Sequence, residues 1–356
     1  MNNYLSQKLK ILSFILIIFV LYIHSSFHAD EIRGIGLSIF YIQKFISGML
    51  GRCAVPLFYM ISGYLFFYKT PEGIKSVLEK MKKRINSLLI PYIIGCLFFV
   101  FFNILISHLP ATSKFVNAYI TSPFNEPFFK AIVRIFYDAG NGSPMAFQLW
   151  FLRDLIILVI LSPIWYYLYK YLKWYWIPVI FILNTISMNR PIEHFPVYSL
   201  FWFSLGGALI KSKFIITVMQ YASKYYITTI LFLVLCILQI IYPSNIQWIY
   251  FQIPIILLGI ISLWICYNGI VASNFDLYNH RWLSTACNYT FFIYLFHEPT
   301  LNIIRKIIAF IIGKNQIGYI ISYLSSPFIF AFFAIIIGML LKKILPNLYT
   351  IIIGGR

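Results

Sequence analysis

The sequence predicts an all-α protein that crosses a membrane about ten times in one helical bundle. Of its 356 residues, 61% are hydrophobic and only 11% carry a charge. Apolar runs of membrane-spanning length recur from one end of the chain to the other, and a helix needs about 20 such residues to cross the hydrocarbon core. We therefore expect a single transmembrane domain over residues 1–356.

Charge and cysteine usage exclude several other classes of protein. The formal net charge is +18, but the basic residues fall in short loops between apolar runs, so we expect no nucleic-acid partner. The five cysteines lie singly in apolar segments without C-x-x-C spacing, which predicts packing residues rather than disulfides. Two histidines on different spans, without Cys or Asp at ligand spacing, also indicate no metal site.

The first predicted span follows Lys8 and Lys10 and runs from about Ile11 to Phe27. This pattern also occurs in signal peptides, but more membrane protein follows and no convincing cleavage site is present, so we expect the span to be retained. The other spans are centred on residues 44–67, 88–107, 147–169, 174–188, 196–211, 225–242, 248–269, 285–310 and 317–341.

The fifth and sixth spans are interrupted by Pro178, Pro196 and the pair Gly206-Gly207, which is typical of a broken or re-entrant region. The excess of Lys and Arg in alternate loops predicts that both termini are cytoplasmic. The longest outer segment is then about 108–146, with an interfacial helix expected at Phe128 to Tyr137.

The second span carries an arginine near its beginning, and an intramembrane charge usually faces a bundle interior or a wet cavity. Helical spacing places Arg52 and Tyr59 on one face and leaves Phe66 to meet lipid. Small residues let membrane helices approach closely, so Ser62 and Gly63 indicate helix packing, with a nucleophilic Ser62 as the alternative.

Ionisable residues gather in the predicted outer half of four spans. His24 lies near the outer end of the first span, Arg52 lies in the second, and the adjacent Arg153 and Asp154 lie in the fourth. The ninth span carries His297 and a face formed by Thr290, Tyr294, Glu298, Asn302 and Arg305.

Each group also has a structural interpretation. Arg153 and Asp154 form either a neutralising ion pair or part of the site. The pair His297-Glu298, before Pro299, is either a buried hydrogen-bonded strut or functional, as ionisable residues at membrane depth usually are.

Five motifs occur in order along the chain: RCAVPLFYMISGYLFF (Arg52 to Phe67), KKRINSLLIPY (Lys82 to Tyr92), LWFLRDL (Leu149 to Leu155), FWFSLGGAL (Phe201 to Leu209) and YTFFIYLFHEP (Tyr289 to Pro299). Together they resemble the membrane-bound acyltransferase-3 family over nearly the whole chain. The resemblance implies an inner (plasma) membrane protein of about ten helices. Many members move an acetyl or other acyl group from a coenzyme A thioester to a hydroxyl of a cell-surface carbohydrate.

The resemblance also assigns individual residues. The family's first-span histidine corresponds to His24, the arginine before its Pro-Leu-Phe-Phe-type sequence to Arg52, and its Y-L-x-H element to the segment from Tyr294 to His297. Two positions depart from the pattern. Members commonly have an arginine eleven residues before the first-span histidine, where this chain has Ser13 and the nearest basic residue is Lys10. Many members also have an arginine three residues after the position of Arg84, where this chain has Ser87. These differences suggest a subgroup of the family.

The chemistry of acyl transfer suits these residues. A sugar hydroxyl is a poor nucleophile, and a histidine with a pKa of about 6.5 can take its proton. We expect His24 to be this general base, with a transient acyl-histidine as the alternative. Arg52 is expected to stabilise the oxyanion or to hold the acceptor, and His297 and Glu298 to orient the base or bind acceptor hydroxyls.

Both substrates have expected contacts. The donor phosphates are cytoplasmic, so Lys82, Lys83 and Arg84 are expected to bind them, although the cluster Lys80 to Arg84 is explained more simply by topology. The acceptor is expected to contact Tyr59, Trp150, Arg153, Asp154 and Tyr294. Acetyl-CoA, or another acyl-CoA, is the donor substrate, and we expect no permanently bound cofactor.

Two other functions stay open at this point. Polar groups in a broken-helix cavity are also typical of a transporter or a flippase of a lipid-linked sugar, although no inverted repeat is visible. A non-catalytic component of polysaccharide export is the third interpretation. The sequence leaves open the acyl group, the acceptor, which ranges from capsule to peptidoglycan, and the oligomeric state.

Overall fold

The computed structural model consists of helices and their connections in the residues that it describes, which are 3–68, 73–107, 126–189, 196–211, 226–242, 248–272 and 280–355. By length and composition, five of these helices can cross a membrane, or six if Phe147–Ile160 and Ser162–Tyr171 form one broken span. The prediction of an all-α protein with membrane-spanning helices is confirmed. The count of ten spans and the cytoplasmic termini stay predictions.

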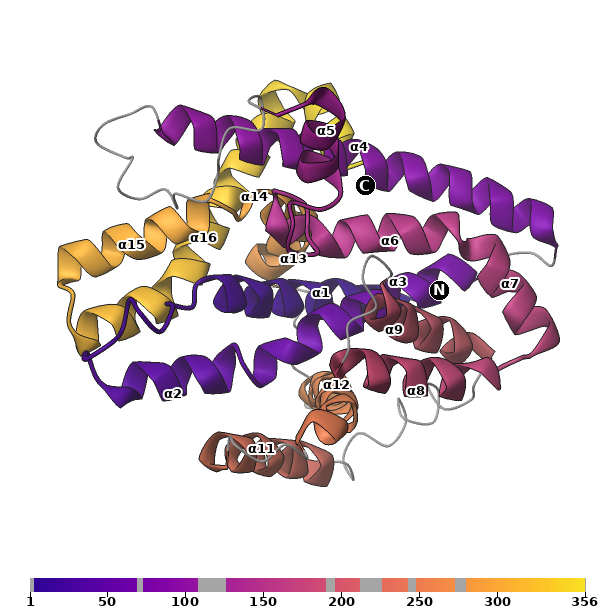
Figure 1. Cartoon of the computed structure of the whole chain (residues 1–356), viewed down its shortest axis with the longest axis horizontal. Coiled ribbons are helices and arrows are strands. Elements are labelled where there is room, and N and C mark those ends of the chain that lie inside the picture. Colours follow the sequence, from indigo (N-terminus) through magenta and orange to yellow (C-terminus); the bar gives the residue numbers. More distant parts are fainter. Residues whose placement is uncertain are drawn as a thin grey trace. The chain divides into compact units, whose positions relative to one another are not determined.

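The chain divides into two compact units, whose helices are labelled in Figure 1. Unit 1 comprises Met1–Pro71, Ile164–Ile192 and Pro196–Thr290. Its helices are α1 (Asn3–His24), α2 (Leu37–Ile46), η1 (Leu50–Cys53), α3 (Ala54–Phe67), α7 (Ser162–Tyr171, from Ile164 onward), α8 (Trp176–Asn189), α9 (Val197–Ala208), η5 (Leu209–Lys211), α11 (Tyr226–Ile241), α12 (Trp248–Ala272) and α13 (Arg281–Asn288).

Unit 2 comprises Glu72–Pro163, Glu193–Phe195 and Phe291–Arg356. The expectation of one domain over the whole chain stays a prediction. The helices of unit 2 are α4 (Ile74–Ser107), α5 (Phe128–Phe136), η4 (Phe147–Leu149), α6 (Trp150–Ile160), α14 (Thr290–Phe296, from Phe291 onward), α15 (Thr300–Ile312), α16 (Gln316–Ile344) and α17 (Pro346–Ile352).

Helices α3 and α9 of unit 1 pack against each other through two glycines. A Cβ atom at Gly63 would collide with the backbone of Phe203, and one at Gly206 would collide with the backbone of Met60. Only glycine allows two backbones to approach this closely. The prediction that Gly63 serves helix packing is confirmed, whereas α9 continues through Gly206 and is not interrupted there.

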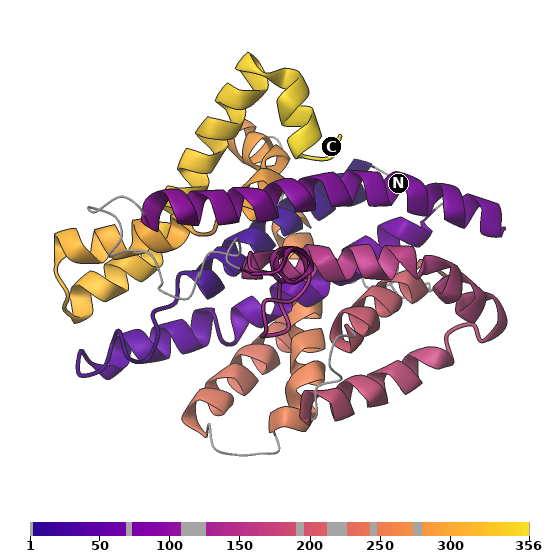
Figure 2. The ribbon, with the colours of Figure 1, turned by 45° about the horizontal axis from the view of Figure 1, so that its top comes forward.

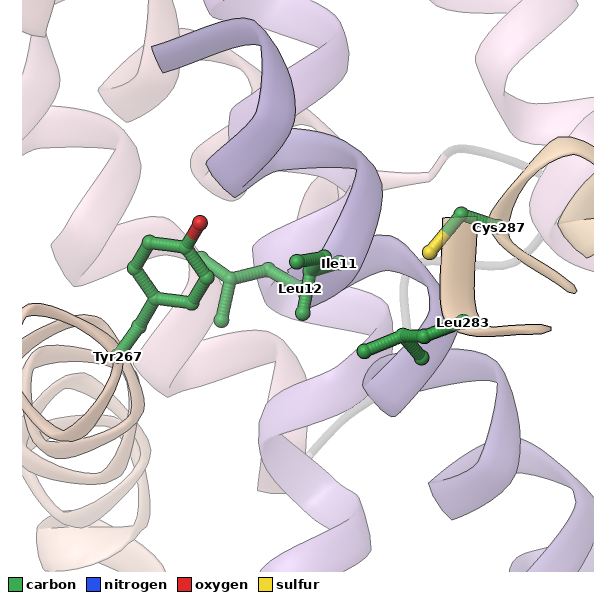
Figure 3. Packing of buried hydrophobic residues seen from close by; sticks show 5 residues of the cluster. All are labelled: Ile11, Leu12, Tyr267, Leu283 and Cys287. Carbon is green, nitrogen blue, oxygen red and sulfur yellow. The ribbon is translucent and has the colours of Figure 1, made fainter. Parts of the chain in front are cut away.

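The core of unit 1 also holds α1 against its neighbours. Figure 3 shows Ile11 and Leu12 of α1 between Tyr267 of α12 and the side chains of Leu283 and Cys287 from α13. All five are buried, so this apolar cluster fixes the middle of α1 within the unit. Cys53, Cys96 and Cys236 are buried as well, whereas Cys266 is exposed.

Unit 2 contains the long helix α4, which packs against α6, and a hairpin in which α15 and α16 lie side by side (Figures 1 and 2). A Cβ atom at Gly95 of α4 would lie 2.8 Å from side-chain atoms of both Leu149 and Leu295, so α4 packs closely on η4 and α14. The Asn315 side chain caps α16 by accepting from the Gly318 amide at 2.9 Å. A helix is present where one was expected at Phe128 to Tyr137, as helix α5, whereas its interfacial location stays a prediction, and residues 108–125 lie outside the described residues.

The structure corrects two details of the predicted spans. The second span is divided into α2, η1 and α3, and Phe66 is 1% exposed because it packs against Phe67 and Phe203 instead of facing lipid. The ninth span is also divided: α14 ends at Phe296 and α15 begins at Thr300. Pro299 has no amide hydrogen for a helical ladder, so the continuous polar face expected there is broken.

Candidate functional site

His24 is the last residue of α1, and hydrogen bonds hold this end of the helix in place. The Ser47 hydroxyl donates to the Tyr22 carbonyl at 2.7 Å, and the Phe27 amide donates to the Gln43 side-chain oxygen at 2.6 Å. Carbonyls at the end of a helix lack intrahelical partners, and here the hydroxyl of Ser47, the residue just beyond α2, satisfies the Tyr22 carbonyl. The position of His24 is therefore fixed by the segment that precedes η1.

Arg52 lies in η1, and this turn packs against the end of α1. A Cβ atom at Gly51 would lie 3.0 Å from the Ile23 side chain, so the residues just before Arg52 and His24 touch each other. Unit 1 thus brings together the two chain segments that carry the predicted base and the predicted cation.

A small cavity of about 10 Å³ adjoins Arg52. Its polar lining consists of Arg52, Gln239 from the last turn of α11 and Gln252 from the start of α12. The Tyr198 and Cys236 side chains lie within electrostatic reach of the guanidinium. In the described part of the chain, the guanidinium makes no hydrogen bond or ion pair. Sequence reasoning assigned no role to the two glutamines, whose only signal was an amide in an apolar span.

Tyr59 of α3 also belongs to unit 1 and is fully buried, with 0% of its surface exposed. Tyr59 lies on the same face of α3 as Gly63 and Met60, and this face packs against α9. Contact with an acceptor therefore stays a prediction for this residue.

In unit 2, a hydrogen-bonded cluster joins the start of α6 to the end of α14. The Tyr294 hydroxyl donates to the Gln148 carbonyl at 3.2 Å, and the Gln148 side-chain amide donates to the Glu298 carbonyl at 3.4 Å. Phe151 packs edge-on against the Tyr294 ring, with ring centroids 5.9 Å apart. Gln148, directly before the LWFLRDL motif, is therefore bound to two residues of the YTFFIYLFHEP motif.

His297 and Glu298 lie in the break between α14 and α15 and are both buried. His297 Nδ1 lies 2.7 Å from the Tyr294 carbonyl oxygen, which can only accept, so Nδ1 carries the hydrogen. In the neutral ring, Nε2 then keeps its lone pair, which is the form a general base needs. Arg305 and Lys306 lie within electrostatic reach of the Glu298 carboxyl group.

Arg153 and Asp154 form the ion pair that the sequence offered as one alternative, with Nη2 and Oδ1 2.8 Å apart. Arg153 Nη1 also donates to the carbonyls of Tyr137 and Gly142 at 2.7 and 2.9 Å. The guanidinium thus holds the chain between α5 and η4. Contact of this pair and of Trp150, the first residue of α6, with an acceptor stays a prediction.

The basic cluster lies on α4 of unit 2. Lys82 and Lys83 are exposed and Arg84 is half-buried. Ser87, at the position where the family resemblance leads one to expect a second arginine, donates from its hydroxyl to the Arg84 carbonyl at 3.1 Å. A backbone contact therefore takes the place of a second cation.

The other difference from the family pattern is Ser13 in α1, where members commonly have an arginine, so the nearby lysines are of interest. Lys10 is exposed, whereas Lys8 is fully buried in unit 1. Lys8 Nζ donates to the Trp264 carbonyl at 3.0 Å and lies 3.7 Å from the centroid of the Trp264 ring, and the Asn268 side chain accepts from it as well. Through these hydrogen bonds and this cation–π contact, Lys8 holds α1 against the second half of α12.

The predicted residues thus divide between the units, with His24, Arg52 and Tyr59 in unit 1 and all the others in unit 2. The model of one protein family, described as an acyltransferase domain, matches residues 7–343. Comparison with curated proteins and with solved structures finds no match. Because the family match covers nearly the whole chain, the resemblance of the five motifs is confirmed, and the chain belongs to the membrane-bound acyltransferase-3 family.

Proposed function

We propose that the protein is an O-acyltransferase of the plasma membrane that moves an acyl group, most simply acetyl, from cytoplasmic acyl-CoA to a hydroxyl of a cell-surface or exported carbohydrate. Membership of the family supports acyl transfer. The observation that carries the proposal is the contact between the end of α1 and η1, which places the segments of His24 and Arg52 side by side. A base and a cation at one end of one unit suit attack on a thioester.

In this reaction the acceptor hydroxyl attacks the thioester carbonyl carbon while His24 takes the hydroxyl proton. Negative charge develops on the carbonyl oxygen, and Arg52 is the cation placed to stabilise it or to hold the acceptor. Collapse of the tetrahedral intermediate breaks the carbon–sulfur bond and forms the ester. The coenzyme A thiolate leaves and receives the proton from His24, which returns the base to its starting form.

Unit 2 supplies the other proposed contacts. His297, whose Nδ1 is bound to the Tyr294 carbonyl, is suited to accept a hydrogen bond from an acceptor hydroxyl through Nε2. The exposed Lys82 and Lys83, together with Arg84, are proposed to bind the donor phosphates. A phosphate beside several cations makes short, charge-assisted hydrogen bonds, and this supports the assignment.

The test measures transfer of radiolabelled acetyl from acetyl-CoA to a glycan fraction, in membranes that contain the wild type, His24→Ala or His28→Ala. His28 is a matched control because it is exposed and lies just beyond the end of α1. We expect transfer in the wild type and in His28→Ala. In His24→Ala we expect a loss of about a hundredfold or more, because a positioned base contributes about 10²–10⁴.

Two results would count against the proposal in different ways. Full activity of His24→Ala would remove this histidine as the base and leave the acyltransferase function standing. If the wild type consumes no thioester but moves a lipid-linked sugar across vesicles, the protein is a flippase. Thermal unfolding in detergent shows whether each variant is folded.

A further inference from the structure

We propose that Arg52, Gln239 and Gln252 form a subsite in unit 1 that binds an anionic group, a carboxylate or a phosphate, on the acceptor glycan. The inference rests on the proposed function and narrows the acceptor to a charged carbohydrate. The three side chains line one cavity and come from η1, α11 and α12.

The charge of Arg52 is the first reason. A guanidinium stays protonated and presents five donors in a planar fork that matches a carboxylate or a phosphate. Among the residues that the structure describes, no acidic side chain pairs with it. Arg153, by contrast, is neutralised by Asp154. A cation at membrane depth is normally paired or faces a wet path, so an anion from the substrate completes the Arg52 site.

The two glutamines are the second reason. Each carboxamide offers two N–H donors and one carbonyl acceptor. Donors from Gln239 and Gln252 can bind the oxygens of an anion that Arg52 holds, while their carbonyls accept from neighbouring sugar hydroxyls. A cavity of about 10 Å³ has room for about one water molecule, so one oxygen of the anion enters it while the rest of the group and the sugar ring stay outside.

The walls of the cavity are held in place by packing. The Cys53 thiol donates to the Ile256 carbonyl at 3.7 Å, directly beside Arg52. A Cβ atom at Gly259 would lie 2.7 Å from the ring of Phe232, which lines the cavity, so α11 and α12 approach closely there. The predicted topology places the connection between α11 and α12 on the outer side, where a surface glycan would arrive.

The test uses thiol labelling and needs no turnover. Gln239→Cys and Gln252→Cys are made in a Cys266→Ser background, because Cys266 is the exposed native cysteine of the described chain. Labelling rates are measured with an anionic sulfonate and with a cationic trimethylammonium methanethiosulfonate reagent. We expect Arg52→Gln to lower the ratio of anionic to cationic rate by about tenfold, as loss of a unit charge a few ångströms away predicts. Gln316→Cys, in unit 2 and outside the cavity, is the matched control and keeps its ratio.

Protection from labelling identifies the ligand. Glucuronate offers a carboxylate, glucose 6-phosphate offers a phosphate, and glucose offers neither. We expect one or both of the anionic sugars to slow labelling of Gln239→Cys and Gln252→Cys several-fold, with the protection lost in Arg52→Gln. The sugar that protects better shows which anion the site takes.

Either of two results would overturn the subsite: an unchanged rate ratio in Arg52→Gln, or equal protection by glucose. Failure of the proposed function gives a different pattern. In that case labelling and protection follow the expectation, while the wild type transfers no acetyl group from acetyl-CoA.

Discussion

Arg52 and Arg153 have a similar predicted depth in the membrane and the same charge, but their surroundings in the structure differ. Arg153 binds Asp154 and the carbonyls of Tyr137 and Gly142, so its donors are engaged within unit 2. Arg52 lines a cavity in unit 1 and, within the described residues, makes no hydrogen bond or ion pair. An engaged guanidinium stabilises the fold, and an unengaged one is available to a ligand.

This difference separates two kinds of charge in a membrane protein. Removal of one partner from a buried ion pair leaves the other charge uncompensated, so the fold loses stability. Removal of a cation that faces a cavity leaves no charge behind. The comparison therefore predicts opposite phenotypes for the same substitution at the two positions.

The largest expected effect is on activity in Arg52→Gln. We expect acyl transfer to fall by about 10²–10³, the usual loss when one preorganised donor to a developing charge is removed. The midpoint of thermal unfolding in detergent should stay close to that of the wild type. Arg52→Lys should restore little activity, because an ammonium lacks the planar fork. Parallel loss of stability and activity would show that Arg52 is structural after all.

The next largest effect is on stability in Arg153→Gln. Breaking a buried pair typically costs about 3–5 kcal/mol, and we expect a loss near the lower value because Arg153 is partly accessible. The free energy of unfolding in mixed micelles measures this loss. The double variant Arg153→Gln with Asp154→Asn should be more stable than Arg153→Gln alone, since it leaves no unpaired carboxylate. Wild-type stability with reduced acceptor affinity would instead place Arg153 in the substrate site.

The smallest expected effect is on the exposed cations of α4. Lys82→Ala and Lys83→Ala should each raise KM for acetyl-CoA about threefold and leave kcat unchanged, because an exposed charge interaction contributes about 0.2–1 kcal/mol. The effect should shrink at high salt. Lys130→Ala on α5 is the control, since it is an exposed cation on the predicted outer side. An equal response of the control would argue against a phosphate site at Lys82 and Lys83.

Much of the fold could be predicted because apolar run length is a strong signal for membrane helices. The all-α class, the packing role of Gly63 and the helix at Phe128 followed from composition and spacing. The breaks at η1 and at Pro299 were harder to place. An apolar run looks continuous in the sequence even where the helix within it is broken. The burial of Phe66 depends on α9, which is distant in the chain.

For the candidate site, the sequence singles out individual residues but not their contacts. His24, Arg52 and His297 stand out because polar groups are rare in apolar spans. Their partners do not stand out: Ser47 supports the end of α1 through a backbone carbonyl, and Gln239 meets Arg52 only after α11 packs against α12 and α2. The sequence also left open whether Arg153 is part of an ion pair or of the site; the structure shows the ion pair and the carbonyls around it, and contact with an acceptor stays a prediction.

The two glycine contacts between α3 and α9 restrict how unit 1 can move. Each glycine meets the backbone of the opposite helix, so sliding either helix along the other would drive Cβ atoms into main-chain atoms. The pair must therefore move as one rigid body. Because η1 leads directly into α3, any displacement of α9 reaches the turn that carries Arg52 without a piston-like shift between the two helices.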